Sequence, residues 1–133
     1  NCTIRFINTM LKIFYVDGGT ANNGKYGSQK SVICSTDASG GSLFFKAIGD
    51  KTNNEAELLA TLELLKTNKL KKLIIFSDSR LAVNLINKEW FTKIDRLKSI
   101  LREIWIIEKQ FELRWIPREE NKAGWIIEEK LGL

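Results

Sequence analysis

Three acidic residues stand where segments of regular pattern begin or end, and the chain supplies no histidine to accompany them. Asp17 ends the apolar run FYVD before two glycines, Asp78 ends the run LIIFSD, and Glu57 lies early in the leucine-rich stretch between them. The absence of histidine excludes a Ser-His-Asp triad, a Cys-His dyad and histidine-ligated zinc. Any hydrolytic chemistry must therefore use carboxylates, whose oxygens suit hard ions such as Mg²⁺ or Mn²⁺.

Each of these carboxylates also has a purely structural interpretation. Asp17 is a suitable turn residue before Gly18, Asp78 can cap the helix that follows it, and Glu57 can be a solvated residue on a helix surface. The three interpretations are independent of one another, whereas a shared site explains all three positions together. The spacing and the element types therefore favour one metal site over three separate structural roles.

The elements that must position these residues follow from hydrophobic period and turn residues. Strands are predicted over 11–19, 25–36, 42–50, 71–79 and 111–119, and helices over 52–68, 79–90, 95–110 and 121–133. The order β-β-β-α-β-α-α-β-α predicts an α/β fold with a five-stranded mixed sheet, three strands antiparallel and two parallel, and helices on both faces. Asp17 and Asp78 then meet at the carboxyl edge, where open α/β sheets bind ligands.

Length and composition predict one domain over 1–133, with residues 1–10 an N-terminal extension or a cut from a longer chain. No apolar run approaches the roughly 20 residues of a membrane span. The formal charge of +5 suits a polyanionic partner, although a mildly basic protein without one is an equal alternative. Cys2 and Cys34 have no metal spacing and indicate reduced residues in a cytoplasmic protein, with a monomer as the default.

The motifs FYVDGG, TNNEAEL and IIFSDS, in this order and spacing, resemble the ribonuclease HI (type 1 RNase H) family over about residues 11–128. The connection INKEWFTKIDRLK is too short for the basic protrusion of some members, so the chain is similar to the compact archaeal-type and retroviral forms. The resemblance implies an RNase H-like fold and a metal-dependent endoribonuclease that hydrolyses the RNA strand of RNA-DNA hybrids. Two Mg²⁺ or Mn²⁺ ions would act there, leaving a 5′-phosphate and a 3′-hydroxyl.

By the same resemblance, Asp17, Glu57 and Asp78 are catalytic metal ligands, with Gly18 beside the metal. Substrate contacts to the 2′-hydroxyl and the backbone are implied for Asn22, Asn23, Thr52, Asn53 and Asn54, although turn and cap roles are alternatives for these residues. Hybrid affinity would also use scattered basic residues. Arg118 would contact the scissile phosphate and Glu119 would affect a metal-bound water, with a solvated loop as the alternative. The basic and aromatic candidates are Lys25, Arg80, Lys88, Lys93, Trp90 and Phe91.

The fourth carboxylate of the family is missing from its usual place. The family motif N-x-x-x-D sets an aspartate four residues after the asparagine, and the residue four after Asn121 is Trp125. Glu128 lies about one helical turn further along, roughly on the same face, and is the preferred catalytic and metal-binding replacement. Glu129, or no fourth carboxylate at all, are the alternatives.

Three functions therefore compete. The first is an active ribonuclease H on RNA-DNA hybrids. The second is a binding module with this fold that holds hybrid or structured RNA but cleaves poorly because its metal site is incomplete. The third is the RNase H domain of a reverse transcriptase.

Overall fold

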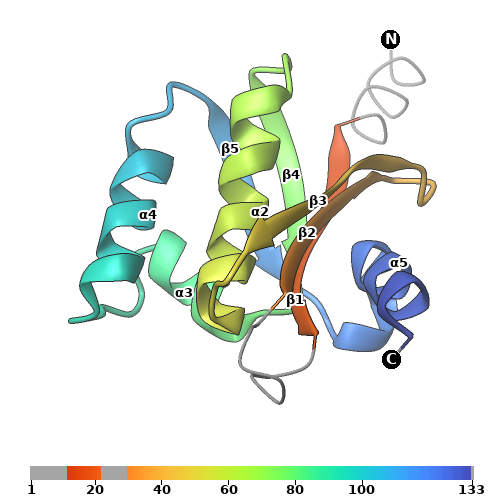
Figure 1. Ribbon diagram of the computed structural model, residues 1–133. Coiled ribbons are helices and arrows are strands. Elements are labelled where there is room, and N and C mark those ends of the chain that lie inside the picture. The colour runs from red at the N-terminus through yellow and green to blue at the C-terminus, as the bar shows by residue number, and fades with distance from the viewer. Residues whose placement is uncertain (1–11, 22–29, 133) are drawn as a thin grey trace, which may run out of the picture.

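The chain folds around one mixed sheet of five strands in the order β3-β2-β1-β4-β5, as Figure 1 shows. The structure is a computed structural model that describes residues 12–21 and 30–132. The strands are β1 (Ile13–Ala21), β2 (Lys30–Asp37), β3 (Ser42–Gly49), β4 (Lys72–Ser77) and β5 (Gln110–Trp115). The helices are α2 (Asn53–Thr67), α3 (Arg80–Ile86), α4 (Asp95–Trp105), the short 3₁₀ turn η1 (Arg118–Glu120) and α5 (Lys122–Leu131).

Strand pairing follows the predicted pattern. β1 pairs antiparallel with β2, and β2 with β3, while β1–β4 and β4–β5 are parallel. A turn over 38–41 links β2 to β3, and helices make the crossovers that parallel pairing requires. The predicted mixed sheet, with its order of strands and helices, is confirmed.

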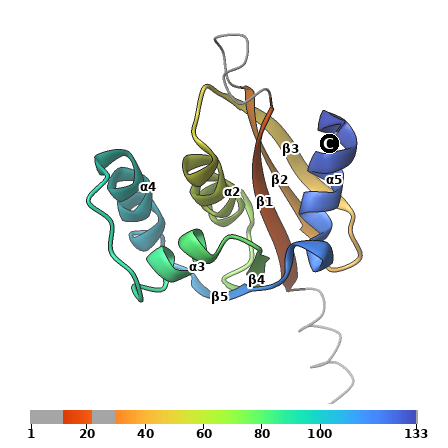
Figure 2. The same ribbon diagram turned by 90° about the horizontal axis from the view of Figure 1, so that it is seen from below.

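Helices cover both faces of the sheet, as predicted. The side chains of β1 alternate between the two faces, so neighbouring residues of this strand pack into different hydrophobic clusters. Phe14 and Val16 belong to the large core formed with α2, α3 and α4. Tyr15 packs instead on the smaller cluster that includes Cys34 and Ile127 of α5. Figure 2 shows α5 on the opposite side of the sheet from α2 and α4. Because side chains alternate along a strand, Asp17 points to the same face as Tyr15, beneath α5.

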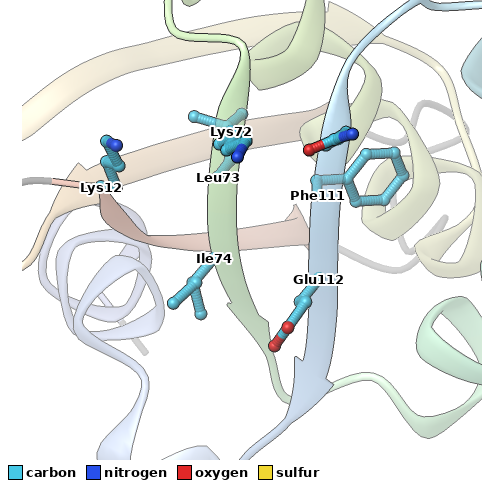
Figure 3. A pocket seen from close by; sticks show the side chains of 7 residues that line it. Lys12, Lys72, Leu73, Ile74, Phe111 and Glu112 are labelled. Carbon is cyan, nitrogen blue, oxygen red and sulfur yellow. The ribbon is translucent and has the colours of Figure 1, made fainter. Parts of the chain in front are cut away.

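The α5 face of the sheet is covered over β1 and β2, where α5 makes its sheet contacts. On β4 the alternating residues Ile74 and Phe76 remain only half-buried. Phe76 packs against Tyr15 with ring centroids 5.6 Å apart. A hollow of about 320 Å³ lies at the start of β4 and β5, and Figure 3 shows its lining side chains on the two strands.

Several predicted boundaries are wrong. The helix predicted over 79–90 ends at Ile86, because Asn87 turns its side-chain amide to the carbonyl of Leu113 at 2.9 Å and Lys88 adopts a φ of 62°. The next helix ends at Trp105 rather than 110. The last strand, predicted to reach 119, ends at Trp115, and Pro117 precedes η1.

No helix within residues 12–21 and 30–132 has the length and apolar character needed to cross a membrane.

Candidate metal centre at the carboxyl edge of the sheet

The parallel pairing of β1 with β4 ends at Tyr15 and Phe76, so the next residues of both strands lie beyond the ladder. Asn121, fully buried at the start of α5, occupies this position. Its side-chain nitrogen donates to the carbonyl of Val16 at 2.9 Å and to Oδ2 of Asp78 at 3.0 Å. One amide therefore satisfies a strand carbonyl that has no β4 partner and fixes the carboxylate at the end of β4.

The carboxylates of Asp17, Glu57 and Asp78 lie together, each offering an oxygen within 4.8 Å of the others. Gly18 makes this possible by allowing α2 to lie against β1. A Cβ on Gly18 would be 2.4 Å from the carbonyl carbon of Ala56 and 2.7 Å from the backbone nitrogen of Glu57. The family resemblance implies a metal beside this glycine. Its closest neighbour is the backbone of α2.

Burial raises the pKa of all three carboxyl groups, and a negative charge nearby raises each one further. Burial, followed by the negative charge of Asp78, raises the pKa of Asp17 to about 7. Burial, followed by the charges of Asp17 and Asp78, raises the pKa of Glu57 well above its ordinary value. Burial also raises the pKa of Asp78, while the bond from Asn121 and the charge of Arg118 act against it. The cluster is therefore unfavourable as three bare anions.

A divalent cation would remove this repulsion, and the donor set fits one. Oε2 of Glu57 is buried and has no hydrogen-bond partner in the part of the chain that the structure describes. A buried carboxylate oxygen normally has a partner. With three clustered carboxylates and no nitrogen or sulfur donor among them, the group has the all-oxygen chemistry that Mg²⁺ and Mn²⁺ prefer.

A cavity of about 350 Å³ opens over the carboxylates. Its walls come from the carboxyl end of β1, the first turn of α2, the start of α3, η1 and α5. The lining residues are Asp17, Gly18, Gly19, Thr20, Asn53, Asn54, Glu57, Asp78, Ser79, Arg118, Ile127 and Glu128.

The predicted substrate residues at the start of α2 have two different roles. Thr52 is the N-cap, and its hydroxyl accepts from the backbone of Glu55 at 3.2 Å while the Glu55 carboxylate accepts from the backbone of Thr52 at 3.3 Å. This capping box uses the Thr52 side chain to hold the helix start. Asn53 and Asn54 are exposed and line the cavity beside the carboxylates.

Two arginines lie at the rim. Arg118 lines the cavity, with its Nε 3.4 Å from Oε1 of Glu128. The Arg80 guanidinium stacks over the ring of Trp115, with its carbon 3.9 Å from the ring centroid. The Trp115 indole nitrogen in turn donates to the carbonyl of Asp78 at 3.0 Å. Arg80 is thus tied through one tryptophan to the backbone of the residue that carries a cluster carboxylate.

Helix α5 approaches the carboxylates through Gly124, where a Cβ would be 3.1 Å from Oδ2 of Asp17 and 3.7 Å from Oδ2 of Asp78. Trp125 points away from this contact: it is half-exposed, and its indole nitrogen donates to the carbonyl of Glu119 at 3.1 Å. Glu128 lines the cavity and its charge acts on Asp78, whereas Glu129 is exposed. Of the two glutamates, Glu128 is the one that lines the cavity over the cluster.

Other sequence candidates lie elsewhere. Asn22, Asn23 and Lys25 fall outside the described residues. Lys88, Trp90 and Phe91 line a separate hollow of about 340 Å³ between α3 and α4, and Lys93 is exposed in the connection before α4. Sequence reasoning did not assign Thr20, Ser79 or Ile127 to the cavity. Asn121 served there only to locate the family motif. Its place at the start of the last helix was a signal that its side chain could cap that helix and contact a neighbouring strand.

Comparison with known proteins identifies the family. The family model described as Reverse transcriptase-like matches residues 15–125. A ribonuclease H1 named LC11, isolated from compost by a metagenomic approach and solved in complex with an RNA/DNA hybrid, is 30% identical with a TM-score of 0.65, covering 82% of this chain and 87% of that chain. No curated protein matches the chain.

Two further structures share the fold at lower identity. Ribonuclease H1 of the halophilic archaeon Halobacterium salinarum is 23% identical with a TM-score of 0.65, covering 84% of this chain and 89% of that chain. The N-terminal RNase H domain of a Mycobacterium tuberculosis protein is 20% identical with a TM-score of 0.64, covering 84% of this chain and 92% of that chain. The family match and the 30% identical relative show that the chain belongs to the ribonuclease HI-type enzymes of the Reverse transcriptase-like family.

Proposed function

We propose that this ribonuclease H is a metal-dependent endonuclease that hydrolyses the RNA strand of RNA-DNA hybrids. The observation that carries the proposal is the cluster of Asp17, Glu57 and Asp78 within 4.8 Å, at the floor of a cavity walled by amide and guanidinium groups. The LC11 ribonuclease H1 structure, in complex with an RNA/DNA hybrid, supports the choice of substrate.

Asp17, Glu57 and Asp78 would hold the metal, with Gly18 beside it and Glu128 as a fourth carboxylate. Two Mg²⁺ or Mn²⁺ ions, when bound, would supply a nucleophilic hydroxide and stabilise the leaving 3′ oxygen, which yields a 5′-phosphate and a 3′-hydroxyl. The protein keeps the carboxylates in place: Asn121 fixes Asp78, and the glycine contact of α2 fixes Glu57.

Selection of RNA would come from the amides at the first turn of α2. Asn53 and Asn54 each offer a donor and an acceptor beside the carboxylates, and a 2′-hydroxyl is both donor and acceptor. Thr52 supports them by capping the helix. Asn22 and Asn23 remain proposed contacts on the basis of family resemblance.

The arginines would bind phosphates. Arg118 lies over the cavity, where a scissile phosphate must sit between it and the carboxylates. Arg80, held flat on Trp115, would grip a neighbouring phosphate of the backbone. Both contacts add a salt-dependent component to hybrid affinity. We propose that the enzyme acts as a monomer in the cytoplasm.

Incubating a labelled RNA-DNA hybrid with the protein and Mg²⁺ or Mn²⁺ tests the proposal. A DNA duplex of the same base sequence is the substrate control, and Asp78→Asn and Glu128→Gln are the protein variants. We expect cleavage of the RNA strand only, with 5′-phosphate ends, near-complete loss in Asp78→Asn and a strong reduction in Glu128→Gln. Equal cleavage by parent and Asp78→Asn would refute the site. Full activity of Glu128→Gln would remove Glu128 from it.

One observation favours a second candidate, a hybrid-binding module that cleaves poorly. Trp125 occupies the position at which the family motif sets a carboxylate, and its side chain contacts Glu119 rather than the cluster. In that case the parent binds the hybrid but leaves the RNA strand intact at every Mg²⁺ and Mn²⁺ concentration.

A further inference from the structure

Lysine side chains gather at the end of the sheet where β4 and β5 begin, far from the carboxylate cluster. They come from the residue before β1, the loop between α2 and β4, the first residue of β4 and the loop between α4 and β5. We call this group the distal lysine surface, and its members are Lys12, Lys71, Lys72 and Lys109.

Hydrogen bonds fix these separate segments beside one another. The backbone nitrogen of Ile74 donates to the carbonyl of Lys12 at 2.9 Å, and that of Gln110 donates to the carbonyl of Lys71 at 2.8 Å. Lys109 extends its ammonium group to the carbonyl of Asn68 and so ties the two loops together. The lysines are therefore held as one surface by the sheet itself.

The positive charge of this surface is largely uncompensated. None of the ion pairs found within residues 12–21 and 30–132 includes a lysine of this surface. Glu112, on the adjacent strand β5, is paired with Arg114. Glu108 is the remaining carboxylate that lines the hollows at this end. Lysine clusters of this kind raise the local concentration of polyanions.

The surface is shaped rather than flat. Two hollows, of about 320 Å³ and about 500 Å³, share Lys72 and Gln110 in their walls. Figure 3 shows Lys12, Lys72 and Glu112 around the first of them, with Phe111 on β5. Phe111 is half-buried against the core, so no exposed aromatic ring of the described residues lining these hollows offers a base-stacking platform. The chemistry suits phosphates and not bases.

The distal lysine surface is separated from the carboxylates by the length of β4. Lys72 opens the strand and Asp78 follows its last residue, which at about 3.3 Å per residue places them roughly 20 Å apart. Figure 1 shows the start of β4 at the opposite end of the sheet from the first turn of α2. A phosphate at this surface is therefore not the phosphate that the carboxylates engage.

We propose that the distal lysine surface binds the phosphate backbone of a second nucleic-acid segment, independently of the carboxylate cluster. The contact is sequence-independent and depends strongly on salt, because lysines that neutralise phosphates release condensed counterions. It tethers the enzyme to long nucleic acids while the cluster engages a hybrid.

Fluorescence anisotropy of a labelled DNA duplex of about 30 base pairs, titrated with the full chain at several salt concentrations, tests this proposal. The test variant is Lys71→Gln/Lys72→Gln, and the matched control is Lys46→Gln/Lys130→Gln, which removes the same charge from β3 and α5. In the test variant we expect the slope of log K against log salt to fall by about 2, with at least about tenfold weaker binding at low salt. In the control we expect the slope to change by less than about half as much.

Equal changes in the two double variants would show a response to net charge alone and overturn the proposal, as would no change in either. A short hybrid that covers only the carboxylate edge should be cleaved equally well by the parent and by Lys71→Gln/Lys72→Gln. Failure of the parent to cleave that hybrid refutes the proposed nuclease function and leaves the duplex-binding result intact, so the two outcomes are distinguishable.

Discussion

Replacing Asp17 with asparagine should make the metal-free protein more stable while it removes metal binding. Burial and the charge of Asp78 raise the pKa of Asp17 to about 7, against an ordinary value of 3.8. Between these two pH values the folded state holds a proton that the unfolded chain has lost. The free energy of unfolding therefore falls as pH rises from about 4 to about 7 and stays lowered above it.

The size of this effect follows from the same two values. The difference between about 7 and 3.8 corresponds to about 4 kcal/mol of unfavourable interaction at neutral pH and above. An asparagine keeps the shape and loses the charge, although its amide also needs partners. We expect a net gain of about 1 to 3 kcal/mol at pH 8. The gain should shrink by about 2 to 3 kcal/mol at pH 5, where the parent's carboxyl group is protonated.

Urea denaturation in the presence of a chelator, at pH 5 and pH 8, measures both quantities. Glu103→Gln is the matched control, since it neutralises an exposed carboxylate on α4 with the same chemical change. Millimolar Mg²⁺ or Mn²⁺ is then added. At a concentration about 100 times Kd, the metal should stabilise the parent and the control by about 2.7 kcal/mol per site, and Asp17→Asn by much less.

Two results would refute this reasoning at different steps. If Asp17→Asn is less stable than the parent at pH 8 without metal, then the cluster is not a source of electrostatic strain. If the metal stabilises parent and variant equally, the cluster is strained but is not where the ion binds.

Three further predictions concern the residues that hold the cluster together. Asn121→Ala should lower the free energy of unfolding by about 2 to 4 kcal/mol in urea titrations, because the Val16 carbonyl and the Asp78 carboxylate both lose their donor; a loss under about 0.5 kcal/mol would contradict it. Gly18→Ala should cost at least about 3 kcal/mol by the same measurement, since the new methyl group would meet the backbone of Ala56, and unchanged stability would show that α2 can move away. Trp115→Phe keeps a ring under Arg80 but removes the donor to the Asp78 carbonyl; calorimetric Mg²⁺ affinity should fall about tenfold while the KM for hybrid changes little, and the reverse pattern would assign Trp115 to substrate binding alone.

The sequence was most informative where local and global preferences agree. A helix is predicted by the capping residue Thr52 and the leucine spacing that follows it, and this helix is α2. A buried strand is predicted by the apolar run before Asp78, and this strand is β4. The two aspartates could be placed at one sheet edge because strand ends next to a helix or a glycine pair define that edge. The element order placed Glu57 early on the helix between the two strands, and the family resemblance implied that it joins the aspartates.

Other features depend on contacts between distant residues and had no local signal. The end of α3 is set by an Asn87 contact with β5, 26 positions away. The role of Asn121 depends on where the β1–β4 ladder stops, which no hydrophobic period reveals. The distal lysine surface joins residues of three separate segments, and only the folded sheet places them side by side.

The bond from Asn121 to Val16 joins residues 105 positions apart, which has a consequence for how the enzyme is made. Asp17, Glu57 and Asp78 all leave the ribosome before Asn121, whose amide fixes Asp78, and before Arg118 and Glu128. A loop of this length closes late, and until it does, the carboxylates repel one another without their anchoring amide. Nuclease activity should therefore appear only after α5 has docked on the sheet.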